Sequence, residues 1–400
     1  MPLLAPVIKA ARARAEEMKR VLGTAEVARW RSLLAPRWLP LPEVPRGAGR
    51  RPAAGRDVHV AVDGTGHMVQ LSYGAHFILA VAAAGGPDWA RQRERADMEI
   101  LPARYDDGQA ASARDLLMRS LEAFVATDVA GAVVDRGLAR SAVLWIDGSL
   151  YADLSHMAGA PGQVRWGSGV ERAGTLLRTT AALLDLAERH QLWLIGIGKT
   201  QQAGFLYDAL TAPALTELAA APGGRRPLAR PLAEPLGEPG AERPSDGELL
   251  AAAPTGWSWP LLLDGTRFPH LGPDAAEALK DCPAIVSCYV RPHPADLPLR
   301  VDIPASAVGL DQRLLPDLLG QAPTPWPAWV PDPAAVLPVI EVALSAYGGV
   351  HAYNAPLYAV DRRVRLSRRD LETRFLPICA RVAGIPPAAL AVNRGRRRFL

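Results

Sequence analysis

The sequence predicts an α/β protein in which a mixed β-sheet is flanked by helices. Residues 58–63 alternate between apolar and polar positions, as a half-buried strand does. Residues 142–146 and 192–197 are continuous apolar runs, which are typical of strands buried on both faces. Between these runs, residues 112–129 and 169–190 have apolar positions at helical spacing. The chain of 400 residues is long enough for such a core with additions at both ends.

The N-terminal part is predicted to be helical and to lie outside the sheet. Apolar residues recur at helical spacing through residues 6–34, with Arg and Glu between them. Residues 36–55 are rich in Pro, Gly and Arg, a composition typical of a connector. We therefore expect residues 1–50 to form an N-terminal helical segment and linker.

The core elements follow in a defined order. The strand at 58–63 runs into an Asp-Gly turn signal, and apolar and aromatic residues resume through residue 81, which predicts two or three antiparallel strands. A helix, a strand, a second helix and a further strand come next. The predicted order is therefore hairpin strands, helix, strand, helix, strand.

The second half of the chain is predicted to add strands and helices to this core. Residues 219–254 are a Pro, Gly, Ala and Glu mixture without periodicity, which indicates a flexible insertion or long loop. Residues 284–291 and 299–303 have the pattern of paired strands, and residues 334–347 that of a helix. We expect one domain over residues 56–371.

Residues 372–400 are expected to form a C-terminal segment that ends in a basic tail. Four of the five residues at 394–398 are Arg, and Phe399 and Leu400 follow them. Such a tail could neutralise the phosphates of a polyanionic partner, or it could simply be solvated. Its apolar tip could instead dock on a partner.

Composition limits the class of protein. The formal net charge of +4 permits a polyanionic partner without requiring one. Three cysteines, none in a CxxC pair, support neither a disulfide framework nor a structural zinc site. The first 20 residues show no signal-peptide pattern, and no stretch approaches the roughly 20 apolar residues of a membrane helix. These features favour a cytoplasmic location.

Two aspartates at the ends of apolar strands are the main candidates for site residues. Asp63 and Asp147 each end such a run, where a buried unpaired charge would be costly unless it had a function. Asp-Gly is also a strong turn signal, as Asp264 with Gly265 illustrates, so either aspartate alone could be a turn residue. The order of strands and helices is that of a ribonuclease H-like metal site, in which such strands lie side by side.

The helix between the two aspartates offers a third carboxylate. Glu122 lies at the edge of the apolar face, and Asp115 lies on nearly the same side; we choose Glu122. Close carboxylates repel one another unless a divalent cation holds them, and oxygen ligands suit Mg²⁺ or Mn²⁺. Two such ions can activate water and stabilise the leaving oxygen of a phosphodiester. Lys199, after the next strand, could meet phosphate charge or be a surface lysine.

Four segments, in order, resemble motifs of the NurA family of DNA nucleases. They are Ala-Val-Asp-Gly-Thr at 61–65, Leu-Trp-Ile-Asp-Gly-Ser-Leu at 144–150, Leu-Ile-Gly-Ile-Gly-Lys-Thr at 194–200, and Tyr-Asn-Ala-Pro-Leu-Tyr-Ala-Val-Asp at 353–361. Each motif is weak alone, but their order and strand contexts together are specific. The chain departs from the family at Thr65 and Gly198, where serine is usual, at Asn354, where proline is usual, and at Asp361, where many members have histidine.

The resemblance implies a set of site residues and an activity. Asp63, Glu122 and Asp147 would bind catalytic metal, with Tyr353 and Asp361 completing the site and Asp361 a further candidate ligand. The family also implies two Mn²⁺ or Mg²⁺ ions, a homodimer and a HerA-type hexameric ATPase as partner. The implied activity is 5′ to 3′ exonuclease action on DNA and endonuclease action on single strands, in end resection for double-strand break repair or in phage defence.

Two alternatives remain open from the sequence. Asp63-Gly64-Thr65 also resembles the first phosphate loop of actin-like and sugar-kinase-like ATPases, but no second glycine-rich loop or adenosine motif follows. The chain could also be a catalytically inactive module that binds DNA or an ATPase. The histidines near the site in sequence, His59, His67, His76 and His156, show no metal-ligand spacing.

Overall fold

The computed structural model describes most of the predicted core. It describes residues 4–14, 34–42, 55–151, 154, 169–199, 203–220, 245–251, 253–264, 273–314, 327–386 and 390–392. Several sequence predictions therefore fall outside the described residues: the helical pattern at 15–33, most of the insertion at 219–254, His156, Thr200 and the basic tail. No helix in the described part of the chain has the length and apolar character needed to cross a membrane.

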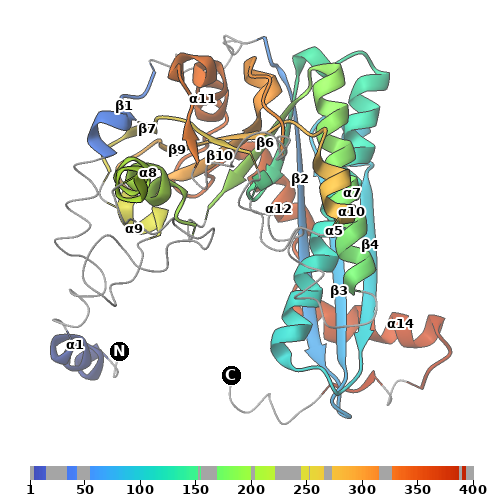
Figure 1. Ribbon diagram of the computed structural model, residues 1–400. Coiled ribbons are helices and arrows are strands. Elements are labelled where there is room, and N and C mark those ends of the chain that lie inside the picture. The colour runs from blue at the N-terminus through green and yellow to red at the C-terminus, as the bar shows by residue number, and fades with distance from the viewer. Residues whose placement is uncertain are drawn as a thin grey trace.

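One mixed sheet runs through the molecule (Figure 1). The order of its strands is β1-β7-β9-β10-β6-β5-β2-β3-β4. Two further strands lie outside this order: β8 pairs with β9, and β11 pairs with β8. The strands are β1 (Trp38–Leu39), β2 (Val58–Gln70), β3 (His76–Gly85), β4 (Glu94–Leu101), β5 (Ala142–Asp147), β6 (Trp193–Gly198), β7 (Gly256–Ser258), β8 (Leu261–Leu263), β9 (Ile285–Arg291), β10 (Leu299–Pro304) and β11 (Ala328–Trp329).

The half of the sheet from β4 to β6 has the topology of a ribonuclease H-like core. In chain order the first three strands, β2, β3 and β4, form an antiparallel meander, and β5 and β6 add to β2 in parallel. The spatial order is thus third, second, first, fourth, fifth. The elements follow one another along the chain as predicted, the two strands that carry Asp63 and Asp147 lie side by side, and the predicted fold class is confirmed.

Helices cover both faces of the sheet (Figure 1). The first face packs against the helices that connect the parallel strands, and the second packs against helices from the C-terminal part. The helices are α1 (Leu4–Ala13), α4 (Asp88–Arg91), α5 (Asp107–Asp135), α7 (Gly169–His190), α8 (Phe205–Ala220), α9 (Asp246–Leu250), α10 (Pro273–Leu279), α11 (Leu337–Ser345), α12 (Ala355–Val364), α13 (Arg368–Asp370) and α14 (Leu376–Val382).

The long helix α5 extends beyond the predicted 112–129 at both ends. It begins in a capping box, in which Asp106 accepts from the backbone of Gln109 and the Gln109 side chain accepts from the backbone of Asp106. The apolar side of α5 packs on β2 and β3. This contact determines which side chains at the edge of the apolar face point towards the sheet.

The structure corrects the predicted turn at Asp63-Gly64. Strand β2 continues to Gln70, and Asp63 pairs with Ala83 in the middle of a long antiparallel ladder. Gly64 lies within this strand, and the residue is a glycine because the space that a side chain would occupy is taken. An added Cβ would lie 2.7 Å from Glu122 Oε1. The glycine serves a close approach by α5 and not a reversal of the chain.

Most other sequence predictions agree with the structure, with two exceptions. Residues 36–55 were predicted to be a connector, but β1 lies within them and pairs with β7 in the sheet. The other exception is in the insertion. Helix α7 has the predicted bounds, and β9 and β10 are the predicted antiparallel pair. Within 219–254, however, α8 reaches Ala220, and α9 is a capped helix with Leu249 and Leu250 fully packed. A capping box of Ser245 and Glu248 holds α9, a signal that the low periodicity of the segment concealed.

Candidate active site

Asp63 and Asp147 occupy equivalent places on neighbouring parallel strands. In the register of β2 and β5, Val62 pairs with Ile146, and each aspartate is the next residue along its strand. Ala61 and Trp145 belong to the core on the α12 face, so alternation places both carboxylates on that face. Neighbouring strands lie about 4.8 Å apart, which makes the two aspartates adjacent.

Glu122 reaches the same place from the opposite face of the sheet. It lies on α5, and its side chain packs over Gly64, directly after Asp63. Asp115, the other carboxylate considered on this helix, pairs instead with Arg114 at 2.7 Å and is half-exposed. The helix thus presents one acidic side chain to the strands and keeps the other at its surface.

Lys199 and Tyr353 complete the surroundings of Asp147. The Lys199 ammonium donates to Asp147 Oδ2 at 2.7 Å and lies 4.2 Å from the centroid of the Tyr353 ring. The Tyr353 hydroxyl is buried against Asp147 and has no partner in good hydrogen-bond geometry. Lys199 itself is half-exposed, so its charge remains accessible from outside.

Helix α12 brings Asp361 to the group. The helix packs on β2 and β3, with Leu357 and Val360 buried against the sheet. It begins at Asn354, which is buried and whose side chain accepts from Leu357 N at 3.0 Å. The departure from the family's proline at this position therefore has a structural use, because Asn is a favourable N-cap. Asp361 is partly buried beside the other acids.

The pKa values show that these acids share one electrostatic environment. The pKa of Asp63 is raised to about 7, first by burial and then by the negative charge of Asp147. The pKa of Glu122 is raised to about 8 by burial and by the charges of Asp63 and Asp147. Asp361 contributes to the raised pKa of Asp63, and burial with Asp147 raises the pKa of Tyr353.

The donor set suits a divalent cation, although the side chains are arranged around Lys199. Among the described residues, no three His, Cys, Asp or Glu side chains converge closely enough to hold an ion as they stand. The acids nevertheless offer oxygen ligands, which Mg²⁺ and Mn²⁺ prefer, and burial with mutual repulsion is what a cation would relieve. The buried Tyr353 hydroxyl, which lies against Asp147, adds an oxygen at the same place.

A second group of buried polar residues escaped the sequence analysis. Asp302 on β10 is fully buried; it pairs with Arg300 at 2.7 Å and accepts from Ser149 Oγ at 2.6 Å. Ser149 is two residues beyond Asp147, so this group contacts the segment that leaves the candidate site. The signal in the sequence is the alternation Leu-Arg-Val-Asp-Ile at 299–303, where opposite charges share one face of an otherwise apolar strand.

The described histidines near the site in sequence serve structural roles or lie apart from it. His59 stacks on Trp145, accepts from its Nε1 at 3.0 Å and contacts the Arg56 carbonyl. Buried His76 pairs with Asp107 at 3.0 Å. His67 is half-buried on β2 beyond Gly64.

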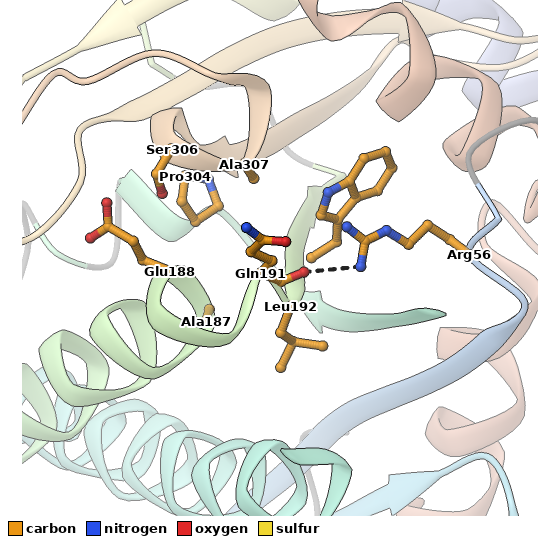
Figure 2. A pocket seen from close by; sticks show the side chains of 9 residues that line it. Arg56, Ala187, Glu188, Gln191, Leu192, Pro304, Ser306 and Ala307 are labelled. Atoms are coloured by element: carbon orange, nitrogen blue, oxygen red, sulfur yellow. Dashed lines mark hydrogen bonds between the residues drawn. The ribbon is translucent and has the colours of Figure 1, made fainter. Parts of the chain in front are cut away.

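A pocket lies at the other end of the parallel strands (Figure 2). Its volume is about 260 Å³, and its lining includes Glu188, Trp193 and Arg56 but none of the candidate site residues. Arg56 donates to the carbonyl oxygens of Ala139 and Gln191, each at 3.0 Å, and stacks over Trp193. These contacts tie the starts of the strands together, which gives this end of the sheet a structural role.

Several solved structures are similar to this chain. A NurA structure from Sulfolobus solfataricus is 14% identical, covers 94% of this chain and 95% of its own, and has a TM-score of 0.48. Another NurA structure is 12% identical, covers 94% and 98%, and has a TM-score of 0.49. A third, with bound dAMP and manganese, is 11% identical, covers 94% and 96%, and has a TM-score of 0.44.

The sequence comparisons give one family and no individual relative. No curated protein matches the chain. The family model of the NurA domain matches residues 57–366, which include every candidate site residue and every strand of the described sheet except β1. The chain therefore belongs to the NurA family of nucleases.

Proposed function

We propose that this protein is a metal-dependent nuclease that hydrolyses phosphodiester bonds in DNA at the group formed by Asp63, Glu122 and Asp147. The observation that carries the proposal is that these three acids, from β2, β5 and α5, act electrostatically on one another, while Lys199 pairs with Asp147. A structural role would favour balanced charge, since unpaired buried charge is costly. An excess of carboxylates at the edge of parallel strands is instead what phosphodiester hydrolysis with divalent metal uses.

Each residue has a proposed role. Asp63, Glu122 and Asp147 would hold a pair of Mn²⁺ or Mg²⁺ ions, with Asp361 as a further ligand. Bound ions would activate water and stabilise the leaving oxygen. Lys199 is half-exposed and held between Asp147 and the Tyr353 ring, where it can turn towards a phosphate of the substrate. Tyr353 orients Lys199 and contributes its hydroxyl beside Asp147.

Membership in the family supports finer proposals. We propose that residues 56–371 form the nuclease unit, a range that the family match at 57–366 supports. We further propose a preference for Mn²⁺, 5′ to 3′ exonuclease action with endonuclease action on single strands, a homodimer and a HerA-type ATPase partner. End resection in double-strand break repair or defence against phage would be the setting, and a cytoplasmic location would accompany either.

The experiment incubates the purified protein with end-labelled linear single- and double-stranded DNA in Mn²⁺, Mg²⁺ or EDTA. The wild type is expected to shorten DNA with metal, and EDTA or Asp147→Ala is expected to abolish cleavage. Asp115→Ala is the matched control, because Asp115 is an acid of the same helix that pairs outside the site. Absence of cleavage in every metal, also with a HerA-type partner and ATP, would contradict the proposal and favour an inactive binding module.

A further inference from the structure

The segment that follows Asp147 folds back over the neighbouring strand β6. Gly148 N donates to the carbonyl of Ile197 at 2.9 Å, and Gly148 has a φ of +116°, which favours glycine. Gly196 on β6 leaves room for the crossing segment, because a Cβ added there would lie 2.8 Å from the Gly148 carbonyl oxygen and 2.9 Å from Leu150. The hydrogen bond of Gly148 and the close packing over Gly196 thus place the segment against β6.

Asp302 then fixes the segment from the next strand. It pairs with Gly196 in the ladder of β10 and β6, so its carboxylate lies beside the crossing point. The same oxygen, Oδ2, accepts from Ser149 Oγ at 2.6 Å and from Tyr151 N at 3.3 Å. One carboxylate oxygen therefore holds two residues of the segment within four positions of Asp147.

The other oxygen of Asp302, Oδ1, accepts a hydrogen bond from Arg300 on the same strand. Arg300 Nε lies 2.7 Å from Oδ1 and also donates to Ser287 Oγ at 2.9 Å. Asp302 and Arg300 are both almost completely buried. The carboxylate is thus fixed in orientation before it contacts the segment, as expected of a group that sets the position of another.

We infer that Ser149 and Asp302 are positioning residues that hold the Asp147 carboxylate in the orientation needed to bind the metal. The inference rests on the proposed function and goes beyond it, because neither residue is placed at the reacting atoms. Partners that orient metal ligands are commonly worth about 10- to 100-fold in metal affinity. Loss of the Ser149 hydroxyl should therefore weaken metal binding without unfolding the protein.

The experiment compares Ser149→Ala, Ser149→Thr and the control Ser287→Ala in the full-length protein. Ser287 is the matched control, because its hydroxyl belongs to the same buried network but contacts Arg300 and not the segment. Mn²⁺ affinity is measured by calorimetry, thermal stability by melting, and DNA cleavage by kcat and KM. Ser149→Ala is expected to weaken Mn²⁺ binding about tenfold and to lower kcat at unchanged KM. Ser149→Thr should restore both, and Ser287→Ala should leave Mn²⁺ affinity within about twofold of the wild type.

Each contrary result has a distinct meaning. Wild-type affinity and kcat in Ser149→Ala would overturn the inference and leave the proposed function intact. Equal weakening in Ser149→Ala and Ser287→Ala would also overturn it, because the effect would then be a general loss of packing. A wild type that neither binds Mn²⁺ nor cleaves DNA would remove the proposed function, and the positioning role with it.

Discussion

Two groups of charged residues lie at one sheet, and they differ in charge balance. In the first, Asp63, Glu122 and Asp147 lie near one another and Lys199 pairs with Asp147, and burial with mutual repulsion raises the pKa of Asp63 and Glu122. In the second, Asp302 pairs with Arg300, and both oxygens of its carboxylate accept hydrogen bonds.

This difference in charge balance distinguishes the candidate metal site, which is the first group, from a structural group in the core, which is the second. In the second group the charges are paired and the buried carboxylate is hydrogen-bonded at both oxygens, which is the condition for its persistence in a core. The first group keeps an excess of negative charge, and a bound divalent cation would compensate it. A variant in each group should therefore have opposite consequences for activity and stability.

The largest effect is expected at Asp147. Asp147→Asn removes a charged metal ligand worth several kcal/mol of transition-state stabilisation, and about 1.36 kcal/mol is tenfold in rate, so cleavage should fall roughly 10³-fold or more. Thermal stability without metal should stay level or rise, because repulsion with Asp63 is relieved. Rates from gel-based cleavage and melting curves test both parts. An active variant would remove Asp147 from the site.

Asp302 should show the reverse pattern. Asp302→Ala leaves the buried Arg300 charge unpaired, and loss of one partner of a buried pair costs about 3–5 kcal/mol. Chemical denaturation should show this loss in the free energy of unfolding. The control Arg95→Ala breaks an exposed pair with Asp128 and should cost about 1 kcal/mol or less. Equal losses in both variants would contradict the balanced-core interpretation.

Gly64 tests the approach of Glu122 to the strands. A Cβ in Gly64→Ala would lie 2.7 Å from Glu122 Oε1 and 2.9 Å from its Cγ, so the carboxylate must move. We expect cleavage to fall on the order of 10²-fold, as for a 1 Å misplacement at an active site. Gly131→Ala is the control. Gly131 lies on α5, the helix that carries Glu122, and a Cβ added there would meet nothing within 4 Å. Full activity in Gly64→Ala would place Glu122 outside the reaction.

The smallest expected effect is the pH dependence of stability without metal. Burial and the neighbouring acids raise the pKa of Glu122 to about 8, so between its unfolded value and pH 8 the folded state binds more protons than the unfolded state. Stability from this group is full at low pH and is lost as pH rises towards 8. Glu122→Gln should therefore gain stability over the wild type as pH increases from 5 to about 8.5.

Melting curves of both proteins across this pH range, with EDTA present, measure that difference. Glu341→Gln supplies a control, since Glu341 lies on α11 away from the acids. A constant difference between wild type and Glu122→Gln at every pH would show that Glu122 does not titrate in this window.

The sequence predicted the order of the core because long apolar runs and helical spacing are local signals. Helix α7 and the pair β9 and β10 follow directly from such patterns. Asp63-Gly64 was predicted wrongly as a turn, because the reason for Gly64 is a contact with Glu122, which lies 58 positions later in the chain. Local turn preference cannot report an approach by another element.

Site residues were predictable to the extent that strand order brings them together. Asp63 and Asp147 could be paired from the topology alone, whereas Tyr353 and Asp361 came only from the family resemblance. Asp302 was missed, since its contact with Ser149 joins a strand to a segment that is far away in the sequence. The charged alternation on β10 was visible, but nothing local says which segment it holds.

The most direct test of the account is a crystal of the protein grown with Mn²⁺ and measured at the manganese absorption edge. The account predicts anomalous density between the carboxylates of Asp63, Glu122 and Asp147, with the Lys199 ammonium moved away from Asp147. Manganese density at another place, or none in crystals of a protein that cleaves DNA with Mn²⁺, would contradict it.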